Sequence, residues 1–72
     1  MNRQTIGRVL VTMQTMAING IVTASQADIA EQAMVSVSSV QRAIDILVTK
    51  GLIKVLDSDG TTMVNQYKVG VF

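Results

Sequence analysis

The segment "SVSSVQR" begins at Ser36 and places several hydrogen-bonding side chains close together. Its three serines carry hydroxyl groups, which both donate and accept hydrogen bonds. Gln41 adds an amide, and Arg42 adds the segment's only cation, with five donors in a planar fork. These groups recognise polar or anionic partners, and the small serine side chains let such a partner approach the backbone closely.

The chain lacks the side chains that most often carry out covalent and acid–base catalysis. The chain has no Cys and no His, which removes thiolate nucleophiles, disulfides, most zinc sites and imidazole catalysis. The segment 57–68 begins like a calcium loop, but Gly60 comes too early and Lys68 occupies the twelfth position, where such loops carry Glu. The carboxylates are scattered along the chain, at Asp28, Glu31, Asp45, Asp57 and Asp59. We therefore expect a binding protein and not an enzyme, with no catalytic residue, metal site, cofactor or small-molecule ligand.

Composition limits the kind of molecule. The 72 residues suffice for one small domain, and we expect residues 1–72 to form a single one. Apolar residues make up 49% of the chain, which excludes disorder, and no apolar run approaches the roughly 18 residues of a membrane span. Six basic and five acidic residues give a net charge of +1, so bulk charge alone does not indicate nucleic-acid binding.

Hydrophobic spacing predicts a first helix over residues 5–18, with Thr5 as its N-cap and Asn19-Gly20 as its stop signal. Its apolar stripe is Ile6, Val9, Leu10, Met13 and Ala17. Other apolar side chains lie off this stripe or elsewhere on the surface, where they either thicken the core or contact a second subunit. They are Val11, Met16, Ile18, Ile46 and the "VGVF" tail.

Two short helices with a tight turn between them are predicted next. Ser25 is the expected N-cap of the first, and Asp28 suits the positive end of its dipole. Ser36 is the expected N-cap of the second, which runs to Lys50 and ends before a left-handed Gly51. On a helical wheel, the inward side of this second helix carries Val40, Ile44 and Leu47, with Ala43 and Val48 beside them. The outward side carries Ser38, Arg42, Asp45 and Thr49.

Strand signals surround this helical pair. Residues 21–23, "IVT", predict a short edge strand that needs a partner. Residues 52–57 and 62–69 alternate with a period of two, and Asp59-Gly60 between them is a hairpin turn signal. On the last strand, one face carries Met63, Asn65, Tyr67 and Val69, and Tyr67 is expected in the packing and not as a base-stacking platform.

The segment "DIAEQAMVSVSSVQRAIDILVTKGLI" resembles the helix-turn-helix of winged-helix DNA-binding proteins. The matching features are small Ala30 in the first helix, Val35 in the turn, the Ser36 cap, and the closing "GLI". The flanking "ASQADIA" and "VNQYKV" resemble the winged-helix domains of phage and plasmid replication and regulatory proteins. Two positions depart from the family pattern: Met34 stands where Gly is usual in the turn, and Val37 stands where a polar residue is common.

The resemblance spans about residues 20 to 69 and implies an α+β, winged helix-turn-helix fold. This fold has three helices, a short strand and a two-stranded β-hairpin wing. The helix-turn-helix would occupy about residues 25–50 and the wing about residues 52–69. Because a non-Gly residue at positive φ is costly, the turn at Met34 is expected to differ in shape.

The same resemblance implies that the third helix enters the major groove of double-stranded DNA. The candidate DNA-binding residues are Ser25, Gln26, Ser36, Val37, Ser38, Ser39, Gln41, Arg42, Lys54, Thr61 and Thr62. Arg42 is the first candidate for a guanine or phosphate contact, unless it forms a surface ion pair with Asp45. The alternative for Ser38, Ser39, Lys54 and Lys68 is that they are simply solvated. Because Asp57 and Asp59 would repel phosphates, the wing either stays clear of the DNA or meets it through Thr61 and Thr62.

The sequence is therefore compatible with two functions. The first is sequence-specific binding of double-stranded DNA by a homodimer or cooperative homo-oligomer, in transcription regulation or in plasmid or phage replication or maintenance. For this function we expect a cytoplasmic, nucleoid-associated protein that is encoded by a bacterium, a phage or a plasmid. The second is a winged-helix protein-interaction module without DNA binding, which the low net charge, Val37 and the acidic wing favour.

Overall fold

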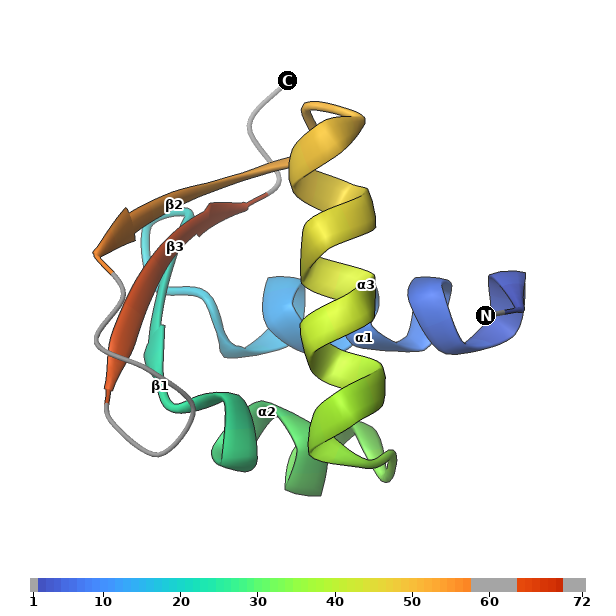
Figure 1. The fold of residues 1–72 in the computed structure, drawn as a ribbon. Coiled ribbons are helices and arrows are strands. Elements are labelled where there is room, and N and C mark those ends of the chain that lie inside the picture. Colours follow the sequence, from blue (N-terminus) through green and yellow to red (C-terminus); the bar gives the residue numbers. More distant parts are fainter. Residues whose placement is uncertain (1, 58–63, 70–72) are drawn as a thin grey trace.

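A computed structural model describes residues 2–57 and 64–69 of the chain. The elements are α1 (Arg3–Met16), β1 (Ile21–Ala24), α2 (Gln26–Ala33), α3 (Val37–Thr49), β2 (Ile53–Asp57) and β3 (Asn65–Val69). In Figure 1, α3 crosses in front of α1, α2 lies beside the N-terminal end of α3, and the sheet lies on one side of α3. The fold is α+β and has the three helices and the sheet of a winged helix-turn-helix, as the sequence predicted.

All six elements contribute to one hydrophobic core. Its largest fully buried side chains include Tyr67, Met13, Ile29 and Leu47. Burying a side chain of the Leu or Ile type stabilises the fold by about 1.5–3 kcal/mol, so a few such residues decide whether a chain of this size stays folded. Tyr67 is 1% exposed, which confirms that it packs in the interior.

The sheet places the last strand in the middle. Its order is β1-β3-β2, and both pairings are antiparallel, with Val22 opposite Tyr67 and Ile53 opposite Val69. The predicted edge strand therefore exists, and its partner is β3. Asn65, Tyr67 and Val69 share the buried face, as the alternation predicted. The register shifts between Val55 and Asp57, which marks a bulge in β2. The predicted turn at Asp59-Gly60 and the predicted position of Met63 on one face of the last strand lie outside the described residues.

The first helix begins and ends earlier than predicted. The side-chain oxygen of Asn2 accepts a hydrogen bond from the Thr5 backbone N–H at 2.9 Å, so Asn2 is the N-cap and Thr5 lies inside the helix. At the other end, α1 stops at Met16, and Asn19 and Gly20 take positive φ values of 54° and 80°. They form a tight turn across which Ile18 and Ile21 exchange two backbone hydrogen bonds, at 2.9 and 3.1 Å. The Asn-Gly signal thus makes a hairpin-like turn instead of the end of the helix.

The apolar residues outside the predicted stripes divide into two groups. Met16 packs against the core and Val69 belongs to it, whereas Val11 and Ile18 are 60% and 77% exposed. Val48, which the helical wheel placed beside the buried face, is 38% exposed and lies at the edge of the core. Residues 70–72 of the tail lie outside the described part.

Candidate nucleic-acid interface

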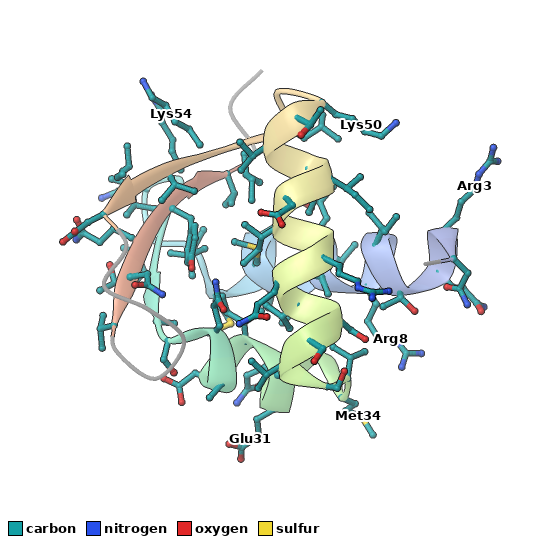
Figure 2. The ribbon with its side chains drawn as sticks, viewed as in Figure 1. Arg3, Arg8, Glu31, Met34, Lys50 and Lys54 are labelled. Atoms are coloured by element: carbon teal, nitrogen blue, oxygen red, sulfur yellow. The ribbon has the colours of Figure 1, made fainter. Side chains whose placement is uncertain are left out.

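The turn between α2 and α3 has the geometry that a helix-turn-helix requires. Met34 adopts the left-handed conformation, with φ 61° and ψ 43°, directly after α2. The Val35 N–H donates to the Ala30 carbonyl at 3.0 Å and the Met34 N–H donates to the Glu31 carbonyl at 3.3 Å. This is the Schellman pattern that usually has Gly at the left-handed position. The expectation that Met34 would change the shape of the turn is therefore wrong: Met34 takes the glycine conformation, and its side chain, 83% exposed, projects into solvent (Figure 2).

The start of α2 is fixed by a capping box. The Ser25 hydroxyl oxygen accepts from the Asp28 N–H at 3.0 Å, and the Asp28 carboxylate accepts from the Ser25 N–H at 3.4 Å. The Gln26 side-chain amide donates to the Tyr67 hydroxyl at 3.5 Å, and its oxygen is buried without a hydrogen-bond partner among the described residues. Ser25 and Gln26 therefore use their side chains within the protein. The DNA contacts predicted for them stay predictions, and these hydrogen bonds do not favour them.

The start of α3 is held by Ser36. Its hydroxyl oxygen accepts from the Ser39 backbone N–H at 3.1 Å, and its hydroxyl donates to the Ser39 hydroxyl at 3.0 Å. The serine cap thus separates the two helices, as the sequence predicted. Because the first-turn N–H groups of a helix have no partner within the helix, this end of α3 attracts anions.

The predicted contact residues of α3 differ in accessibility. Ser36, Ser38 and Arg42 are exposed, and Ser39 and Gln41 are half-buried. Val37 is also half-buried and packs against the core, so only part of its surface can contact a partner. Within the described residues, Arg42 forms no ion pair with Asp45, which leaves its guanidinium accessible.

This geometry agrees with a comparison of the sequence with known protein families. Residues 7–53 match a family described as a helix-turn-helix domain, and this segment covers more than half of the 72 residues. The chain belongs to this helix-turn-helix family. No curated protein and no solved structure gives a match. The family segment runs from α1 to the first residue of β2, so it includes both helices of the helix-turn-helix, α2 and α3.

Lys54, the predicted wing contact within the described residues, lies apart from the helix-turn-helix contacts. Lys54 is exposed on β2, near the C-terminal end of α3, whereas Met34 marks the N-terminal end of that helix (Figure 2). Lys54 also stands directly opposite Lys68 in the sheet. The structure therefore does not bring Lys54 together with Ser36 and Arg42, and Thr61 and Thr62 lie outside the described residues. All three stay predictions.

Three polar residues of α1 were not among the predicted contacts. Gln4, Thr5 and Arg8 line a pocket of about 110 Å³ together with Val35, the residue in the turn of the helix-turn-helix. A helical wheel places these three polar residues on neighbouring positions of α1, with Thr5 bordering the buried stripe beside Val9. These positions meet the turn only because α1 crosses α3, and the sequence gives no local signal for such a crossing.

Two further findings concern the described part of the chain. It contains no group of three or more His, Cys, Asp or Glu residues that could hold a metal ion. None of its helices is long and apolar enough to span a membrane.

Proposed function

We propose that this helix-turn-helix protein binds double-stranded DNA sequence-specifically, with the N-terminal half of α3 in the major groove, and that it has no enzymatic activity. The observation that carries the proposal is the uncovered face at the start of α3, where Ser36, Ser38 and Arg42 are exposed beside a left-handed turn. The family membership supports the same function.

The chemistry of this face suits a duplex. The major groove is about 12 Å wide and admits a helix, and Arg is the side chain that most often pairs with the two acceptors of guanine. One good contact of this kind discriminates against the wrong base by about 1–3 kcal/mol. The serine hydroxyls bond either to phosphates or to several base edges, so Arg42 is expected to carry most of the preference for one sequence.

We also propose that several copies act together. One domain makes few contacts with a duplex, and joining copies raises the effective concentration of the second contact. Val11 and Ile18 support such an arrangement, because both are exposed apolar side chains of α1 and the turn that follows it. In such a form the protein would act as a transcription regulator or as a replication or maintenance factor of a plasmid or phage.

The experiment selects duplexes from a random pool and then compares two variants on the best duplex. Arg42→Ala is expected to weaken binding at least tenfold and to remove most of the preference for the selected sequence. Lys50→Ala is the matched control, because it removes the same charge from the C-terminal end of the same helix. Equal losses in the two variants would show that α3 does not read sequence through Arg42. Failure of the wild-type protein to retain any duplex at low salt would favour the protein-interaction module instead.

A further inference from the structure

We propose that Arg8, with Gln4 and Thr5, forms a phosphate-binding site on α1 that holds the DNA strand on the side of α3 opposite the sheet. This inference rests on the proposed function and adds a contact that lies outside the α2–α3 pair. It starts from the pocket of about 110 Å³ that these three residues line together with Val35.

The pocket has the chemistry of an anion site. The Arg8 guanidinium, the Gln4 amide and the Thr5 hydroxyl are all hydrogen-bond donors, and none of the described residues that line the pocket is acidic. On this measure of volume a single water needs about 10–15 Å³, so the pocket has room for a group of a few heavy atoms such as a phosphate. Arginine suits that group because its planar fork donates two parallel hydrogen bonds to phosphate oxygens.

The position of the pocket fits a duplex held by α3. Val35 lies in the turn directly before the Ser36 cap, so the pocket adjoins the end of α3 that is proposed to enter the groove. The N-terminal half of α1 extends past α3 on the side away from the sheet (Figure 1). A helix in the major groove has a phosphate backbone on each side of it. The sheet and the start of α2 therefore lie toward one strand, and Arg8 lies toward the other.

Arg8 is free to make this contact. It is exposed and, within the described residues, has no ion pair. In Figure 2 its side chain projects from α1 close to the N-terminal half of α3, while Arg3 projects from the far end of α1. The two arginines are thus a natural pair for comparison: they share a helix, a charge and an exposed position, and only Arg8 lines the pocket.

The test compares Arg8→Ala with Arg3→Ala on two probes, a duplex selected from a random pool and an unrelated duplex of the same length. Arg8→Ala is expected to weaken binding about tenfold on both probes, because a phosphate contact carries no sequence information. It is also expected to reduce the magnitude of the slope of log K against log salt by about 1. Arg3→Ala is expected to change neither quantity beyond a small fraction of that. Thermal unfolding of both variants should match the wild type, since both side chains are exposed.

A second measurement identifies the phosphate itself. Neutral methylphosphonate groups replace the phosphates of the selected duplex one position at a time. We expect one or two positions at which the substitution weakens wild-type binding but leaves Arg8→Ala unaffected. Equal effects of Arg8→Ala and Arg3→Ala, or a loss confined to the selected duplex, would overturn the phosphate site while wild-type binding still supported the proposed function. Absence of duplex binding by the wild-type protein would overturn both.

Discussion

Met34 and Gly51 occupy equivalent backbone positions in different sequence contexts. Each follows a helix, with φ values of 61° and 74°. After α3, the Leu52 N–H donates to the Leu47 carbonyl at 2.9 Å and the Gly51 N–H donates to the Val48 carbonyl at 3.0 Å, the same pattern that closes α2. A left-handed conformation costs a side chain with a Cβ about 1–2 kcal/mol, whereas Gly adopts it freely. The turn of the helix-turn-helix therefore holds backbone strain that the end of α3 does not.

The strain at Met34 predicts that a glycine there stabilises the protein. Met34→Gly is expected to raise the free energy of unfolding by about 0.5–1 kcal/mol, because the strain relieved exceeds the entropy that Gly adds to the unfolded chain. Since the Met34 side chain is 83% exposed, its removal costs little packing. Urea unfolding measures the change. Gln32→Gly is the control, because a glycine placed inside α2 should lower the free energy of unfolding by about 1 kcal/mol. A loss of stability in Met34→Gly would show that the turn depends on the methionine.

At the scale of elements, the sheet contains an unfavourable pair of charges. Lys54 and Lys68 are direct partners across β2 and β3, and both are exposed on the outer face. Like charges that face each other across two strands destabilise the pair, and opposite charges stabilise it by about 0.2–1 kcal/mol. The hairpin thus tolerates a repulsion that a single substitution can reverse.

Lys68→Glu is accordingly expected to raise the melting temperature at low salt by a few degrees. The gain should shrink in 1 M salt, where the screening length falls to about 3 Å. Lys68→Gln separates the two contributions, because it removes the repulsion without adding an attraction. A melting temperature that does not depend on salt, or one that falls in Lys68→Glu, would contradict the electrostatic account.

Elements that are set by local signals were predictable from the sequence. Ser25 and Ser36 cap their helices through their own side chains, and Gly51 ends α3 because it takes positive φ at little cost. The start of α1 was not predictable in the same way, since Asn2 and Thr5 are both capping residue types three positions apart. The choice of Asn2 adds a turn to α1, and a wheel drawn over the sequence does not reveal it.

At the scale of the whole molecule, the basic residues divide into two sets. The arginines lie on α1 and α3, at Arg3, Arg8 and Arg42, and the lysines lie at or beyond the C-terminal end of α3, at Lys50, Lys54 and Lys68. Few cations can therefore reach one duplex together with the start of α3. The parts of the candidate site that depend on this arrangement, such as the position of Arg8 beside Val35, come from the packing of α1 on α3 and have no signature in the local sequence.

This distribution predicts a shallow salt dependence for each bound copy. Arg8 is proposed to contact a phosphate and Arg42 a base, so the slope of log K against log salt should lie between about −1 and −2 per copy, since each neutralised phosphate contributes about −0.9. Titrations at several salt concentrations, with the mass of the complex measured in parallel, give the slope per copy. A slope of −4 or steeper per copy would mean that the lysines also contact the duplex and that the docking proposed for α3 is incomplete.

The central place of β3 has a consequence for how the chain folds during synthesis. β1 and β2 are not neighbours in the sheet, and both pair with β3, which is made after them. The three helices can gather around Val9, Ile29 and Leu47 before that strand emerges from the ribosome, but the hydrogen bonds of the two strand pairings must wait for it. Until then the inner side chains of these strands, such as Val22 and Ile53, lack Tyr67 and Val69 to cover them. Wrong pairing of these two strands is thus expected mainly in the interval before β3 arrives.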